Sequence, residues 1–354
     1  MMVLAVIFFL VLSACAASPA IPDWVTGTKA SAYPDGQFLV GVGQAESRSV
    51  AEERAYAAMA RIFKADVSSR AKDWESYLTL EKRGHVQTER QLTLEVVTQV
   101  TTDKLVENVK IAETWRDPKT GLHSALAVMN REAAQVTFRS KIAEMDDAIS
   151  RDVKEARTTR DTYRQARGIR RAIRTLIIRD ALNSDLRVVI GGRGVVSDHS
   201  LSGLTGELET LLNERLVVAV EVTGDQAKAV WQAVMEGLVR EGLPVTAPSG
   251  GTATADLLVK GEARLWPMEL PDPRFRYARW CAEFVILHQK DQRVLGSVAR
   301  SGREGHLTAT DAAGRALASL QQDIASALAK SLAEHIYGDP PSDSAPAQAA
   351  CPKP

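Results

Sequence analysis

The chain has 354 residues, with 44 Lys or Arg and 44 Asp or Glu, so its formal net charge is zero. This balance gives no overall electrostatic affinity for polyanions, so we expect no nucleic-acid partner. The length is sufficient for two domains with hydrophobic cores of their own.

The N-terminus has an apolar segment, Val3 to Leu12, which is too short to span a bilayer but suits the centre of a signal peptide. Leu12-Ser13-Ala14-Cys15 follows and resembles the lipobox of bacterial lipoprotein precursors. The resemblance implies that residues 1–14 are removed and that the thiol of Cys15 carries lipid. The alternatives are an ordinary signal peptide with an incidental cysteine and a buried strand. No Lys or Arg precedes the apolar segment, which departs from the usual pattern.

A first domain is predicted over residues 23–130, after a lipidated tether at residues 15–22. Phe38 to Val42 reads as a strand, and Ser49 with Glu52 predicts a capping box at the start of a helix. The apolar positions of this helix share one face: Ala51, Ala55, Ala58, Ile62 and Ala65.

Three further segments complete this domain. Leu92 to Val100 is compatible with a helix or a strand. Val106 to Trp115 and Leu122 to Met129 are predicted strands, joined by a turn at residues 117–121.

Residues 131–183 contain no proline, which predicts a helical connector made of two helices that meet near Gly168. Residues 151–174 carry nine basic and three acidic side chains. A continuous helix would place six of the arginines on one face: Arg157, Arg160, Arg164, Arg167, Arg171 and Arg174. Such a stripe suits anionic headgroups or an acidic envelope protein as a partner, and the alternative is a solvated helix face.

Alternating elements predict a second α/β domain over residues 184–338. The expected strands are Leu216 to Val222, Leu257 to Leu265, Arg279 to His288 and Val294 to Arg300, with helices at Asp225 to Arg240 and from Thr308 to the stop at Gly338.

The Pro- and Ala-rich tail, residues 339–354, is predicted to be disordered. Cys281 and Cys351 can pair in an oxidising compartment, but a strand cysteine and a tail cysteine are expected to remain free thiols.

The first domain resembles the Lpp-twenty family of bacterial surface lipoproteins and the N-terminal domain of a flagellar T-ring assembly protein. The matching residues are Pro22-Asp23-Trp24, Val40-Gly41-Val42-Gly43-Gln44-Ala45, the helix residues Ala55, Ala58 and Arg61, and Leu126-Ala127-Val128 before Arg131. The resemblance implies an α/β envelope domain without catalytic residues. The segment Ala255 to Gly261 and the elements after it resemble, more weakly, the module of curli-secretion and penicillin-binding-protein-activator lipoproteins.

Motifs for catalysis are absent from the sequence. Gly41-Val42-Gly43 lacks the third glycine of a dinucleotide loop, because Glu46 stands in its place, so the glycines are interpreted as a tight strand-to-helix turn. Asp198-His199-Ser200 are adjacent and do not form a triad by adjacency. The six histidines lack metal-ligand spacing. We therefore expect no catalytic residue, no metal and no cofactor.

These observations predict an α+β protein of two small α/β domains joined by a long helical segment. The expected function is that of a lipid-anchored, non-enzymatic binding or assembly component of the bacterial envelope. Because Ala16 is not an aspartate, the resemblance to lipoproteins implies the outer membrane, facing the periplasm. Two alternatives stay open: a component of a flagellar or secretion machine, and an envelope hydrolase whose site forms no motif.

Overall fold

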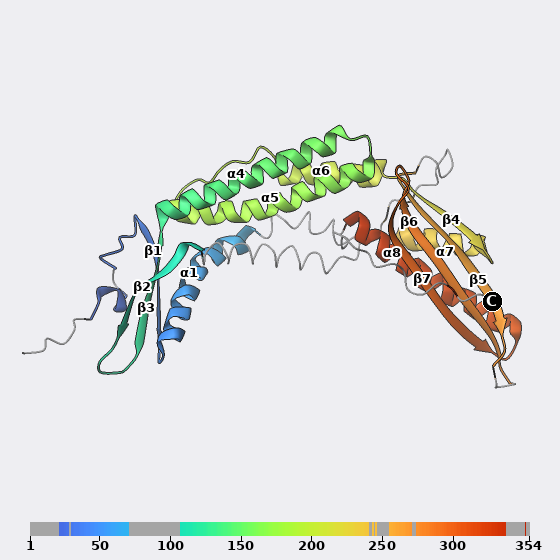
Figure 1. Ribbon diagram of the computed structural model, residues 1–354, viewed down its shortest axis with the longest axis horizontal. Coiled ribbons are helices and arrows are strands. Elements are labelled where there is room, and N and C mark those ends of the chain that lie inside the picture. The colour runs from blue at the N-terminus through green and yellow to red at the C-terminus, as the bar shows by residue number, and fades with distance from the viewer. Residues whose placement is uncertain are drawn as a thin grey trace, which may run out of the picture. The chain divides into compact units, whose positions relative to one another are not determined.

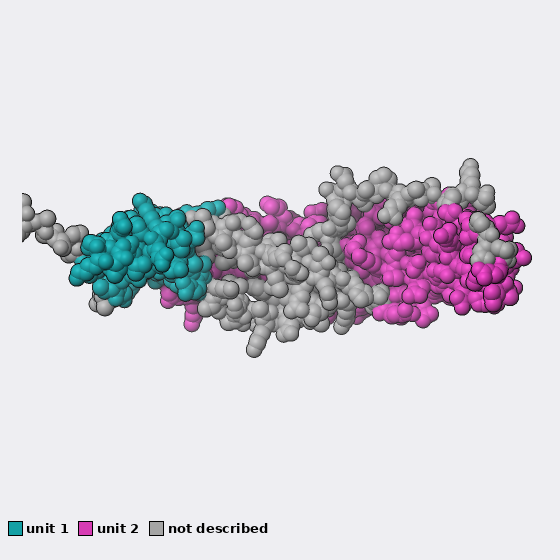
Figure 2. Space-filling model, turned by 90° about the horizontal axis from the view of Figure 1, so that it is seen from below, with its two compact units in different colours: residues 1–62, 105–134 teal, residues 63–104, 135–354 magenta. Residues whose placement is uncertain are grey.

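The computed structural model describes residues 21–27, 30–70, 107–240, 243, 245, 255–270, 274–337 and 351, without the side chains of residues 64–70. The chain forms two compact units, residues 1–62 with 105–134 and residues 63–104 with 135–354, which Figure 2 colours separately. The signal peptide, Cys15, the segment Leu92 to Val100 and the tail apart from Cys351 lie outside the described residues.

The first unit contains a three-stranded antiparallel sheet in the order β1-β3-β2 (Figure 1). Its strands are β1 (Phe38–Ala45), β2 (Val109–Arg116) and β3 (His123–Asn130), and Val40 pairs with Val128 in the register. The predicted turn after β2 is confirmed. Its geometry is set by Asp117, which accepts the Lys119 N–H at 2.8 Å, and by Gly121 at a φ of 75°.

Helix α1 (Arg48–Arg70) lies directly on β1, and this packing explains the glycine pair. A Cβ on Gly41 would lie 2.8 Å from the Ala55 carbonyl oxygen, and one on Gly43 would overlap backbone atoms of Ala51 and Ala55. The interpretation as a tight turn is therefore wrong, because the glycines allow the helix backbone to approach the strand.

The buried face of α1 also differs from the prediction. Ala51, Ala55 and Met59 are buried, whereas Ile62 is 36% exposed. The buried residues of α1 follow steps of four from Ala51, so the buried line turns slowly around the helix and leaves Ile62 outside it. The Ser47 hydroxyl, not that of Ser49, accepts the Val50 N–H at the helix start.

Trp24 holds the start of the domain against the sheet. Its side chain is 4% exposed and shares a small core with Leu126 and Val128. The indole N–H donates to Glu113 at 2.7 Å, and Asp23 accepts the Ser31 N–H at 2.8 Å. The Pro22-Asp23-Trp24 sequence therefore has a structural role in this unit.

The second unit includes two long helices, α4 (Arg131–Thr158) and α5 (Thr162–Ile190), and the break between them corrects a prediction. The chain leaves α4 at Thr158, and the Asp161 carboxylate caps α5 by accepting the Arg164 N–H at 3.0 Å. Gly168 lies inside α5, where an added Cβ would be 2.8 Å from the Cβ of Ala156. It allows close helix packing and is not a junction.

Ion pairs join α4 and α5 in an antiparallel arrangement. The Arg171 guanidinium is 3.1 Å from Asp152, and Arg179, which is 1% exposed, makes a bidentate pair with Asp146 at 2.9 and 3.1 Å. Asp146 therefore neutralises a buried charge.

The helix α5 continues past the predicted end at residue 183 to Ile190. Gly191 ends it at a φ of 63°, a left-handed conformation that favours glycine. Helix α6 (Leu201–Thr210) follows and passes into a π-helical turn, Leu211–Arg215.

The second sheet has the order β4-β5-β6-β7, with β4 and β5 parallel and the other pairs antiparallel. Its elements are β4 (Val218–Gly224), α7 (Ala227–Arg240), β5 (Leu257–Met268), β6 (Arg276–His288), β7 (Arg293–His306) and α8 (Ala309–Tyr337). The predicted strands and helices of this region are confirmed, with β7 six residues longer at its end than the predicted 300.

Helices α7 and α8 cover one face of this sheet (Figure 1). The core between them includes Trp280 and Phe284 from β6 and Leu328 from α8, and it also contains Ile169 and Ile173 of α5. The α+β fold class is confirmed, and the division into domains at residues 130, 183 and 338 stays a prediction.

A disulfide joins Cys281 of β6 to Cys351, with the two Cα atoms 5.8 Å apart. The backbone N–H of Cys351 also donates to the Glu283 carboxylate. The expectation of two free thiols is therefore wrong, because Cys351 lies against β6 beside Cys281.

Candidate functional site

A hollow of about 340 Å³ in the second unit is lined by the end of α4, the first turns of α5 and the β6–β7 turn. Its charged walls are Glu155, Arg164, Arg167, Arg171, Asp291 and Arg293, and Tyr163 and His288 lie among them. We call it the arginine hollow.

His288 is the centre of an ion-pair network in the wall of this hollow. Its Nε2 atom is 2.9 Å from the Asp161 carboxylate, and its Nδ1 atom is 2.7 Å from Asp291. His288 and Asp161 have side chains only 3% and 2% exposed. The Arg164 guanidinium closes the network at 2.7 Å from Asp291 and 3.4 Å from Asp161.

Each ring nitrogen of His288 lies close to a carboxylate, and the Nδ1 contact with Asp291 is a hydrogen bond. The hydrogen bond from His288 lowers the pKa of Asp291 below its ordinary value.

Asp256 lies next to this network at the start of β5. Its carboxylate accepts the Val217 N–H at 2.9 Å. Burial raises the pKa of Asp256, while hydrogen bonds from Val217 and Thr162 oppose the shift. The neighbouring carboxylate of Asp161 raises this pKa further.

Tyr163 forms the floor of the arginine hollow. Its ring is 4% exposed and lies 5.5 Å from the His288 ring between centroids, and its hydroxyl donates to the His335 carbonyl at 3.4 Å. Burial raises the pKa of Tyr163, and Arg167 and Arg293 oppose this shift. The Arg167 guanidinium lies 5.9 Å from the centre of the ring.

The structure divides the six stripe arginines among three places. Arg157 lies in the last turn of α4 and pairs with Glu207 at 2.7 Å, and Arg160 is exposed in the connection to α5. Arg164, Arg167 and Arg171 line the hollow, while Arg174 is half-buried further along α5. The prediction of one continuous helical face is wrong, because the helix break at residues 159–161 separates the first two arginines from the rest.

Asp198, His199 and Ser200 do not form a triad in the structure. The Ser200 hydroxyl accepts the Gly203 N–H at 3.2 Å and caps α6, and the Ser197 hydroxyl accepts the His199 backbone N–H at 3.3 Å. The three letters therefore mark a helix start.

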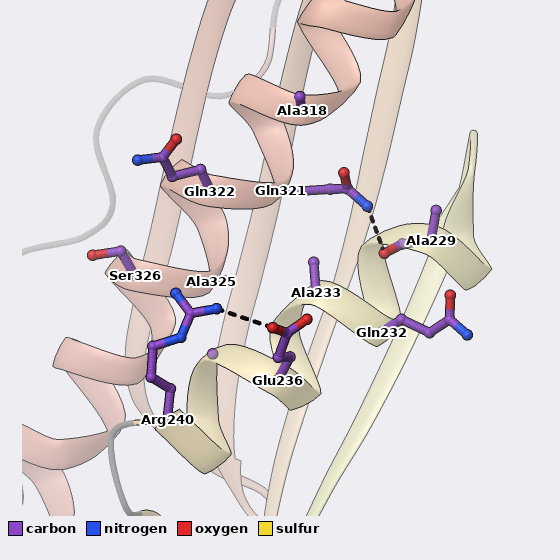
Figure 3. A pocket seen from close by; sticks show the side chains of 11 residues that line it. Ala229, Gln232, Ala233, Glu236, Arg240, Ala318, Gln321, Gln322, Ala325 and Ser326 are labelled. Carbon is purple, nitrogen blue, oxygen red and sulfur yellow. Dashed lines mark hydrogen bonds and ion pairs between the residues drawn. The ribbon is translucent and has the colours of Figure 1, made fainter.

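A second hollow, of about 640 Å³, lies between α7 and α8. Figure 3 shows that polar side chains and alanines form its walls. Gln321 donates to the Ala229 carbonyl at 2.9 Å, and Arg240 pairs with Glu236 at 3.1 Å. Its one cation is neutralised within the wall, so this hollow offers less for a charged ligand than the arginine hollow does.

Among the described residues, one group of potential metal ligands comes together: Cys281, Glu283 and Cys351. The two sulfur atoms are bonded to each other in the disulfide, so neither is available as a thiolate ligand.

Sequence reasoning missed His288, Asp161, Tyr163, Asp291 and Arg293 as members of one site. Asp161 carries the signal of a helix N-cap, which could have been recognised. The other residues come from different elements, and no spacing links them.

The comparisons with known proteins place the first domain in a family. The model of the LPP20 lipoprotein family matches residues 22–130, so this segment is an LPP20 lipoprotein family domain. No curated protein matches the sequence.

Solved structures show weak similarity. The secreted protein HP1454 of Helicobacter pylori is 15% identical, with a TM-score of 0.36, and the match covers 84% of this chain and 97% of that one. A minor lipoprotein from Acinetobacter baumannii is 11% identical over 34% of this chain and 91% of its own, with a TM-score of 0.25. These similarities are too weak to transfer a function.

A helix that crosses a bilayer needs about 20 predominantly apolar residues. Each of the described helices is too short or too polar to cross a bilayer.

Proposed function

We propose that this protein is a bacterial envelope lipoprotein, anchored by lipid on Cys15, that acts as a non-catalytic binding or assembly component. The observation that carries the proposal is the position of the LPP20 lipoprotein domain. It begins at residue 22, directly after the lipobox-like Leu12-Ser13-Ala14-Cys15 and a short tether. A soluble domain in this position needs an acyl anchor to stay at a membrane.

The disulfide between Cys281 and Cys351 supports export. Disulfides persist in oxidising compartments such as the periplasm and are rare in the reducing cytosol. This support is independent of the N-terminal sequence, because it comes from the opposite end of the chain.

Ala16 follows the proposed lipidated residue and supports the outer membrane as the destination, with the domains in the periplasm. The His288 side chain is buried and lies against the carboxylates of Asp161 and Asp291, which supports a structural role for it in a binding site.

The experiment is metabolic labelling with an alkyne-bearing palmitate, followed by fractionation of the membranes on a density gradient. We expect the native protein to carry the label and to sediment with the outer membrane. Cys15→Ser should lose the label, and Cys351→Ser, the matched control for loss of a cysteine, should keep it. An unlabelled native protein in the soluble fraction would contradict the proposal.

A further inference from the structure

Two arginines of the arginine hollow have no acidic partner. Arg164 pairs with Asp161 and Asp291, and Arg171 pairs with Asp152. Among the described residues, no carboxylate forms an ion pair with Arg167 or Arg293. These two cations therefore remain available to an anion.

Arg167 and Arg293 come from different elements and meet at one place. Arg167 lies on the second turn of α5, and Arg293 begins β7. Both line the same hollow, and both act electrostatically on the hydroxyl of Tyr163. The Tyr163 side chain is held in place by its burial and by the hydrogen bond from its hydroxyl to the His335 carbonyl.

The surroundings hold the two cations in position without neutralising them. The His288 network places the β6–β7 turn, because Asp291 contacts both His288 and Arg164 and also accepts the Arg293 backbone N–H at 3.2 Å. Glu155, the other carboxylate of the wall, forms no ion pair with any residue that the structure describes. The four arginines of the wall outnumber the two carboxylates, Glu155 and Asp291.

We propose that the arginine hollow binds a phosphate group between the guanidinium groups of Arg167 and Arg293. Guanidinium groups bind phosphate oxygens with paired hydrogen bonds, and two of them match the charge of a phosphate monoester. A volume of about 340 Å³ is within the size range of small-ligand sites. The inference deepens the proposed binding role and rests on it.

The test uses the full chain, purified in a non-ionic detergent, in calorimetric titrations with inorganic phosphate and with glycerol 3-phosphate. The second probe carries the phosphomonoester of a lipid headgroup. Binding of glycerol 3-phosphate at least about fivefold tighter than inorganic phosphate would assign the site to a headgroup, and equal or weaker binding would assign it to free phosphate. Failure of both probes to bind at millimolar concentration would overturn the inference.

The variant Arg167→Gln with Arg293→Gln should weaken binding of the better probe by about tenfold or more. The matched control is Arg160→Gln with Arg300→Gln, which removes the same charge from exposed positions outside the hollow. We expect the control to change affinity less than about twofold. An equal loss in both variants, or an unchanged affinity in the first, would overturn the inference.

A lysine pair, Arg167→Lys with Arg293→Lys, keeps the inference testable if the glutamine pair does not fold, which circular dichroism would show. Lysine keeps the charge but loses the paired hydrogen bonds, so we expect an intermediate affinity. If the lysine variant binds with the affinity of the native protein, the inference that paired guanidinium hydrogen bonds hold the phosphate is overturned. None of these titrations depends on lipid at Cys15, so their failure is distinct from failure of the labelling experiment.

Discussion

The imidazole of His288 lies 2.9 Å from the carboxylate of Asp161, and both side chains are almost completely buried. The same carboxylate caps α5 through the Arg164 N–H. This interaction therefore joins the end of β6 to the start of α5 at the arginine hollow.

Replacement of His288 by leucine should lower the free energy of unfolding by roughly 3 kcal/mol. The Asp161 carboxylate would stay buried and would lose its contact with the imidazole. Chemical denaturation measures the effect. His199→Leu is the matched control, with an expected change below about 0.5 kcal/mol.

The double variant His288→Leu with Asp161→Asn should be more stable than His288→Leu alone. Asparagine keeps the N-cap of α5 but carries no charge, so nothing charged is left without a partner. A double variant that is less stable than the single one would show that the buried charge is not the cause of the loss.

Replacement of Asp256 by asparagine should stabilise the protein at neutral pH and have less effect in acid. Because burial raises the pKa of Asp256 in the folded state, the unfolded chain releases its proton first as pH rises above the ordinary 3.8. Native stability therefore falls as pH rises through the interval between the two pKa values, and an amide avoids this loss.

The measurement is thermal unfolding of Asp256→Asn and the native protein between about pH 4 and about pH 7. The advantage of the variant should grow with pH and stay within about 1 kcal/mol, since a half-buried carboxylate is partly screened. Asp323→Asn, at an exposed position on α8, is the control. A difference that is independent of pH would contradict the assignment to Asp256.

Replacement of Gly43 by alanine should destabilise the first unit by about 3 kcal/mol or more. The new Cβ would overlap backbone atoms of Ala51 and Ala55, and a backbone cannot move aside as a flexible side chain can. Gly36→Ala is the control, because no atom lies within 4 Å of its added Cβ. Equal stability of the two variants in urea would refute the close approach of α1 to β1.

Loss of the Cys281–Cys351 disulfide should lower the midpoint of thermal unfolding. The bridge joins residues 70 positions apart, and loss of such a bridge costs about 2–4 kcal/mol. Cys351→Ser should match the native protein after reduction, and a reducing agent should not change the variant further. If a tryptic digest made without reductant never contains the Cys281 and Cys351 peptides joined to each other, the bridge itself is contradicted.

The sequence by itself determined most of the secondary structure and the family of the first domain. Strands such as Leu257 to Leu265 and the helix Asp225 to Arg240 were predicted because apolar periodicity is local, and each element buries one face in any compact fold. The motifs of the Lpp-twenty resemblance are also contiguous in the chain, so they can be recognised without a structure.

The tertiary structure alone decided which side chains meet. The face that α1 buries depends on Gly41 and Gly43 of β1, and the bond from Cys281 depends on the position of Cys351 against β6. Arg167 and Arg293 face one hollow because a helix break and a strand turn bring them together. Such contacts have no period in the sequence, since they are set by the packing of elements that are far apart along the chain.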